Sequence, residues 1–153
     1  MELKKKFMIM IMVMSLIGSY VSAHDEGHGP KLSDTGKYGG LVSSVVLKSE
    51  AAKGAGATLV YKAELVRSSD GLARIYFYDS TMKPLDLKGF DVKAVASLGA
   101  KVKGKWKDVA FNLELKDGKF TGKIPTPEAK PFDIDVTLKK DGKELLSAFD
   151  NLD

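Results

Sequence analysis

Short stretches in which apolar and polar residues alternate are the feature that most constrains the fold of this chain. The clearest is Lys107–Lys116, where every second residue is apolar. A repeat of two is that of a β-strand with one buried face, and no stretch after residue 23 keeps the 3.6-residue repeat of a helix. The apolar positions of this strand are Val109, Phe111, Leu113 and Leu115.

Turn residues separate these stretches, with Asp-Gly pairs at 70–71, 117–118 and 141–142. Such pairs between two apolar stretches are typical of hairpins. We therefore predict an all-β fold, an antiparallel immunoglobulin-like β-sandwich of about seven to eight strands. The segments expected to build it are Leu41–Leu47, Thr58–Arg67, Leu72–Asp79, Asp91–Leu98, Ala100–Lys105, Lys107–Lys116, Phe120–Ile124, 132–138 and Lys143–Phe149.

The amino-terminal sequence is typical of a cleaved secretory signal. Lysines at positions 4–6 precede the apolar run Phe7–Tyr20, and small residues lead to Ala23, after which signal peptidase would cut. We predict a signal peptide over 1–23, a flexible polar leader over 24–37 and a β-sandwich domain over 38–153. The expected location is the periplasm, with secretion as the second alternative.

Composition excludes several classes of function. The chain has no cysteine, which rules out disulfides, thiolate metal sites and a cysteine nucleophile. Removal of residues 1–23 lowers the formal net charge from +4 to +2, a balance that does not indicate nucleic-acid binding. No second apolar run follows, so we expect no stable membrane insertion after signal removal.

Both histidines of the chain, His24 and His28, lie directly after the predicted cleavage site. A free N-terminal histidine can chelate Cu(II) through its α-amine and ring nitrogen, while His28, Asp25 and Glu26 could add ligands. The alternative is a polar leader without metal. Cleavage after Val21 would place His24 third in the mature chain, which also favours a square-planar Cu(II) or Ni(II) site.

Four lysines, Lys101, Lys103, Lys105 and Lys107, surround Trp106. Basic residues beside an aromatic ring can bind an anionic polymer through charge and stacking, and in an exported protein that polymer would be lipopolysaccharide or an anionic polysaccharide. The alternative is a solvated hairpin whose lysines protect an edge strand from aggregation.

The sequence offers little for catalysis. No histidine follows position 28, so a Ser-His-Asp arrangement would have to recruit the leader. Asp133 and Asp135 fall on one strand face, opposite Phe132 and Ile134, and we expect this face to be wet. We therefore predict a protein that is not an enzyme.

The sequence contains four short motifs, Lys37–Val42, Tyr61–Val66, Arg74–Asp79 and Met82–Leu85. Together they resemble a loose group of small periplasmic β-sandwich proteins encoded near heavy-metal efflux systems. The resemblance implies a non-catalytic accessory domain in copper or other metal handling. Tyr38 stands where that group has a histidine, and tyrosine is a poor ligand for divalent metals at neutral pH.

We thus predict an exported accessory protein that binds a divalent metal, Cu(II) first, through His24 and His28. It would act beside a metal-efflux or other envelope partner. The alternative is a metal-free interaction module, which docks on an envelope protein or an anionic polymer through a sheet edge or through Lys101–Lys107.

Overall fold

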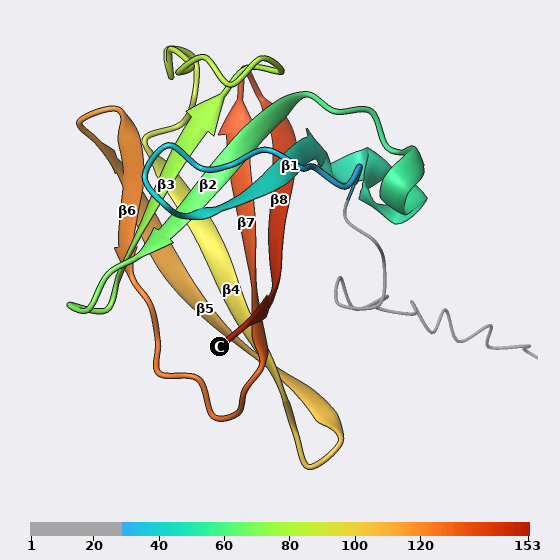
Figure 1. Cartoon of the computed structure of the whole chain (residues 1–153), viewed down its shortest axis with the longest axis vertical. Helices are drawn as coiled ribbons and strands as arrows, with labels where there is room; N and C mark the ends of the chain where they lie inside the picture. The colour runs from blue at the N-terminus through green and yellow to red at the C-terminus, as the bar shows by residue number, and fades with distance from the viewer. Residues whose placement is uncertain (1–28) are drawn as a thin grey trace, which may run out of the picture.

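In the computed structural model, which describes residues 29–153, eight antiparallel strands form a closed barrel (Figure 1). One 3-10 helix, η2 (Lys48–Gly56), follows the first strand. No helix within this range has the length and apolar composition to cross a membrane. The strands are β1 (Leu41–Leu47), β2 (Tyr61–Arg67), β3 (Leu72–Tyr78), β4 (Lys93–Val102), β5 (Lys105–Lys116), β6 (Lys119–Lys123), β7 (Phe132–Lys140) and β8 (Lys143–Leu152).

The predicted immunoglobulin-like sandwich is wrong, because the strands form one ring in the order β1-β2-β3-β6-β5-β4-β7-β8. The ring closes where β1 pairs with β8, through Val45 opposite Ser147 and Val46 opposite Leu146. An alternating strand has one inner face in a sandwich and in a barrel alike, so the sequence pattern does not distinguish the two.

The positions of the strands along the chain agree with the sequence prediction more closely than their arrangement in space does. β1 has the predicted bounds, whereas the two segments expected at 91–98 and 100–105 are replaced by one strand, β4. Gly99, which separates the two predicted segments, lies inside β4 between Asp108 of β5 and Asp133 of β7. The segment directly after β1 forms η2.

The inner faces of all eight strands meet in one hydrophobic core. Large side chains from opposite sides of the ring fill it, including Ile75, Leu113, Phe120, Ile134 and Phe149, all fully buried. Phe77 meets Phe120 edge to face with 5.8 Å between ring centroids, a favoured aromatic geometry. The barrel interior is thus packed with side chains.

Residues 29–40, which we call the strap, run across the outside of the barrel before β1 begins (Figure 1). The strap includes the described part of the segment predicted to be a leader. It contacts β2, where Lys62 forms an ion pair with Asp34 over 2.7 Å. The outer face of β2 is consequently covered, and Lys62 is only 8% exposed.

Candidate functional site

The β4–β5 hairpin projects past one end of the barrel, the lower end in Figure 1. β7 accompanies β4 only as far as Ala100, which lies opposite Phe132, so beyond this point β4 and β5 pair only with each other. The turn residues Lys103 and Gly104 both have positive φ, 51° and 79°, as a two-residue type I′ turn requires. The segment 101–107 is therefore a two-stranded arm.

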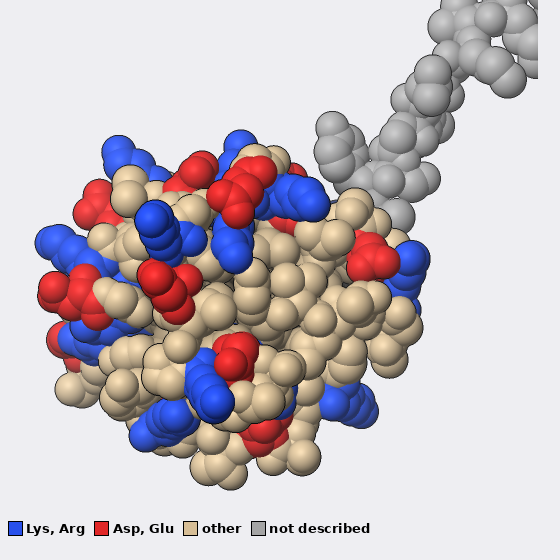
Figure 2. Space-filling view, turned by 90° about the horizontal axis from the view of Figure 1, so that it is seen from above, with Lys and Arg blue, Asp and Glu red and all other residues tan. Residues whose placement is uncertain are grey.

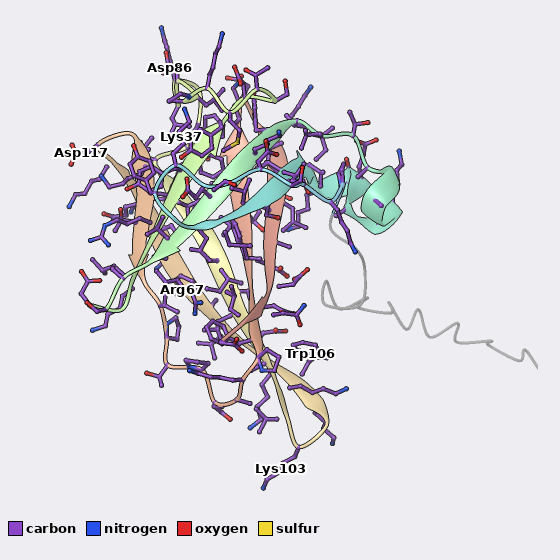
Figure 3. The ribbon with its side chains drawn as sticks, in the orientation of Figure 1. Lys37, Arg67, Asp86, Lys103, Trp106 and Asp117 are labelled. Atoms are coloured by element: carbon purple, nitrogen blue, oxygen red, sulfur yellow. The ribbon has the colours of Figure 1, made fainter. Side chains whose placement is uncertain are left out.

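The structure brings the predicted lysine and tryptophan residues together on this arm. All four lysines are exposed and Trp106 is half-buried. Figure 3 shows Lys103 at the tip and Trp106 nearer the barrel. The lysines that the sequence pattern grouped are Lys101, Lys103, Lys105 and Lys107.

Strand register divides the arm into two faces. Trp106 lies opposite Lys101, and these two share the outer face. Lys105 lies opposite Val102 and Lys107 opposite Ala100, so both of these lysines share the face that continues the inner side of the barrel. The arm presents cations on both faces, with an aromatic ring on one.

Lys107 forms an ion pair with Glu128 over 3.3 Å, and both side chains are more than half exposed. Such surface pairs contribute about 0–1 kcal/mol, so an incoming anion can displace Glu128. Lys101, Lys103 and Lys105 have no ion-pair partner within residues 29–153. By contrast, the opposite end of the barrel shows cations and anions intermixed (Figure 2).

A second site, which the sequence analysis missed, centres on Glu64 of β2. Its carboxylate is fully buried and accepts four hydrogen bonds. Three come from strap backbone N–H groups, those of Lys37 at 2.9 Å and of Tyr38 and Gly40 at 2.8 Å. The fourth comes from the Tyr78 hydroxyl at 2.6 Å. Glu64 thus fastens the strap to the barrel.

The ionisation of this pair follows from its surroundings. Burial acts to raise the pKa of Glu64, but the hydrogen bonds from Tyr78 and the strap outweigh it and leave the pKa below its usual value. Burial, followed by the hydrogen bond to Glu64, raises the pKa of the Tyr78 phenol. Glu64 therefore stays a carboxylate and Tyr78 a neutral donor at neutral pH.

Aromatic and glycine residues complete the strap contact. Tyr38 stacks on Tyr76 with ring centroids 4.1 Å apart, although Tyr38 as a whole remains 59% exposed. A Cβ on Gly36 would lie 2.3 Å from a Glu64 carboxylate oxygen, and one on Gly40 would lie 2.4 Å from the Leu65 carbonyl oxygen. Three of the four motifs behind the resemblance, Lys37–Val42, Tyr61–Val66 and Arg74–Asp79, therefore meet at this contact and hold the strap in place. The spacing of Gly36 and Gly40 was the available sequence signal for this close approach.

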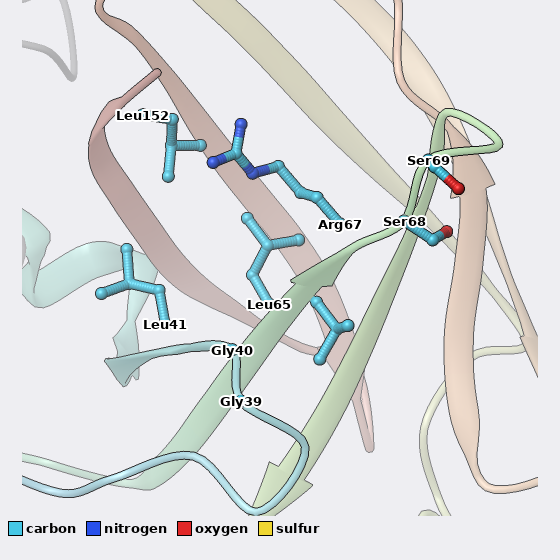
Figure 4. Close-up of a pocket in the computed structure, with 9 residues that line it drawn as sticks. Gly39, Gly40, Leu41, Leu65, Arg67, Ser68, Ser69 and Leu152 are labelled. Atoms are coloured by element: carbon cyan, nitrogen blue, oxygen red, sulfur yellow. The ribbon is translucent and has the colours of Figure 1, made fainter.

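Other candidates carry less chemistry. Asp133 and Asp135 are each only 8% exposed, so the expectation of a wet face is wrong. Asp133 is covered because its carboxylate accepts a hydrogen bond from the Asn151 N–H at 2.9 Å. A hollow of about 640 Å³ lies beside Gly39, Gly40 and Arg67 (Figure 4), but the Arg67 guanidinium already donates to the Asp153 carbonyl oxygen.

The predicted metal ligands His24, Asp25, Glu26 and His28 lie outside the described residues. Within 29–153, no group of three or more histidine, aspartate or glutamate side chains is arranged to hold a metal ion. Comparisons with protein-family models, with curated proteins and with solved structures found no match to this chain. The β4–β5 arm is therefore our candidate site, because the lysines and the tryptophan grouped by the sequence pattern lie together on a hairpin end that projects beyond the barrel.

Proposed function

We propose that this chain is a periplasmic, non-enzymatic binding module that engages an anionic partner through the β4–β5 arm. The observation that carries the proposal is the arm itself. Beyond the closed barrel it holds Trp106 and three lysines that have no ion-pair partner among residues 29–153. Ammonium groups at a projecting tip attract carboxylate, phosphate or sulfate groups without first breaking internal contacts. The ring offers a partner few other strand edges, because β1 and β8 pair with each other.

The test compares two triple variants that remove the same charge. The arm variant should bind poly-L-glutamate or dextran sulfate about tenfold or more weakly, with a smaller salt dependence, because its charges make the contact. The control variant should bind like the unmodified protein. The arm substitutions are Lys101→Gln, Lys103→Gln and Lys105→Gln, and the control substitutions are Lys83→Gln, Lys88→Gln and Lys116→Gln, all at exposed lysines.

Calorimetry on both variants, with thermal unfolding to verify folding, supplies the measurement. Equal loss of affinity in both would show that only overall charge matters, and no loss in either would remove the arm from consideration. Both results contradict the proposal.

A second candidate function, Cu(II) binding at His24 and His28, is favoured by one sequence observation: the two histidines of the chain lie within five residues of each other. A Cu(II) titration of protein that begins at His24, verified by intact mass, should show one equivalent bound. The affinity should be lost when both histidines become alanine and should weaken on acidification, because the ligands must be deprotonated. Unchanged binding in the double variant would refute it.

A further inference from the structure

Among residues 29–153, β5 is paired along one side for most of its length but along the other side only near its end. Its β4 ladder runs from Lys105 to Glu114, whereas β6 meets it only from Glu114 to Lys116. Within residues 29–153, the segment 105–111 therefore has a strand ladder on its β4 side alone. We call its other side the open side of β5.

The chain after β6 does not continue the ladder. The connection 124–131 contains Pro125, Pro127 and Pro131, which have no N–H to donate. Val109 is 44% exposed and Ala110 is exposed, although their side chains project to opposite faces of the strand. Solvent thus reaches both faces beside the open side.

The direction of the backbone groups follows from one hydrogen bond. The Leu115 N–H donates to the Val92 carbonyl oxygen at 2.7 Å, so Leu115 points its backbone groups towards the β4 side. Because this direction alternates along an antiparallel strand, Val109 and Lys107 also point towards β4, and Ala110 points its N–H and C=O to the open side.

We propose, as an extension of the function proposed above, that an acidic, extended protein segment adds to the open side of β5 as an antiparallel strand. Main-chain hydrogen bonds would supply affinity and alternate side chains specificity, as in other cases of strand addition. About seven residues would span the segment 105–111.

The side chains of β5 define what such a segment must carry. On the face that holds Lys105 and Lys107, opposing residues should be acidic, whereas on the outer face Trp106 and Ala110 favour apolar residues. Asp108 shares that outer face and disfavours a carboxylate there. The segment that fits best therefore alternates acidic and apolar residues.

Glu128 shows that a carboxylate can approach this place, since it lies 3.3 Å from the Lys107 ammonium and comes from the connection 124–131. A second copy of β5 fits poorly, because antiparallel pairing of this segment with itself would bring lysines near lysines. Charge complementarity thus selects an acidic partner.

The experiment uses the peptide Glu-Val-Glu-Val-Glu-Val-Glu, acetylated and amidated, and two N-methylated forms. Trp106, the single tryptophan of the chain, reports binding by its fluorescence from within the site. Valines opposite Trp106 and Ala110 would direct their N–H groups to β5, and glutamates opposite Lys107 would direct theirs away. Methylation of the valine nitrogens should weaken binding by about tenfold or more, whereas methylation of the glutamate nitrogens should change it less than about threefold.

The outcomes separate this inference from the proposed function. Equal effects of the two methylations, with binding still dependent on the arm lysines, would overturn strand addition and leave the proposed function standing. Binding of dextran sulfate but not of the peptide would overturn it in favour of a polysaccharide partner. If the Lys105→Glu, Lys107→Glu variant, verified as folded, bound both probes as the unmodified protein does, the proposed function and the inference would fail together.

Discussion

Substitution of Glu64 by glutamine should loosen the strap and destabilise the barrel. One carboxylate oxygen accepts from the N–H groups of Tyr38 and Gly40, and the other accepts from the Lys37 N–H and the Tyr78 hydroxyl. An amide oxygen can replace only one of these oxygens. The amide nitrogen at the second position would face the Lys37 N–H, so that two donors meet without an acceptor, although the Tyr78 hydroxyl can turn to accept.

The magnitude follows from this geometry. One hydrogen bond to a charged group is lost, worth about 1.5–3 kcal/mol, and the remaining ones lose their charge assistance. The relief of a buried charge offsets part of this loss, so we expect the free energy of unfolding to fall by about 3 kcal/mol. At this chain length, that corresponds to a decrease of about 10 °C in Tm.

The assay is urea unfolding followed by circular dichroism, with Glu114→Gln as the control because Glu114 is exposed on β5. The control removes the same charge and should lie within about 0.5 kcal/mol of the unmodified protein. Amide exchange at Lys37 and Tyr38 should accelerate in the Glu64 variant, which detects strap opening even without global unfolding. Equal midpoints and equal exchange in the two variants would refute the role assigned to Glu64.

Two further predictions concern the same contact. The stability advantage of the unmodified protein over Glu64→Gln should be complete above pH 4.5, the usual pKa of a glutamate, and should be lost as the pH falls through the lowered pKa of Glu64 in the folded state. Urea melts at a series of pH values measure this advantage. An advantage that does not change with pH below 4.5 would contradict the prediction. Gly40→Ala should lower the free energy of unfolding by about 1–3 kcal/mol, as measured by thermal melts, because its Cβ would overlap the Leu65 carbonyl oxygen. The control Gly56→Ala should not destabilise the protein, because nothing lies within 4 Å of a Cβ built there. Similar losses in both variants would show that the close approach at Gly40 does not determine the effect.

Strand positions could be predicted from the sequence because a repeat of two directly reflects which side chains face inwards. Phe111 and Leu113 are buried as the pattern of β5 predicts. Val109 has the same parity but is 44% exposed, because β6 pairs with β5 only from Glu114 to Lys116 and does not reach as far as Val109. Alternation defines a face of the strand, but it does not reveal where the neighbouring strands end.

Closure of the ring and the role of Glu64 could not be predicted for a related reason. The ring closes by pairing β1 with β8, the strands at the two ends of the domain, and the sequence of neither strand indicates which strand it pairs with. Glu64 lies on the outer face of β2, as its alternation with Ala63 and Leu65 predicts. The strap buries this face, and a pattern within β2 contains no information about a segment that packs on it from elsewhere.

The pairing of the first strand with the last also sets the order in which the domain can fold. The Ser147 hydroxyl donates to the Ser44 carbonyl oxygen across 103 residues of sequence, so this seam forms only when nearly the whole domain is present. An amino-terminal fragment that lacks β8 leaves one edge of β1 and one edge of β7 unpaired and omits Phe149 from the core. Contacts this distant in sequence form slowly, because a long loop must close before they stabilise the chain. Resistance to proteolysis should therefore arise in one late step, when β8 completes the ring.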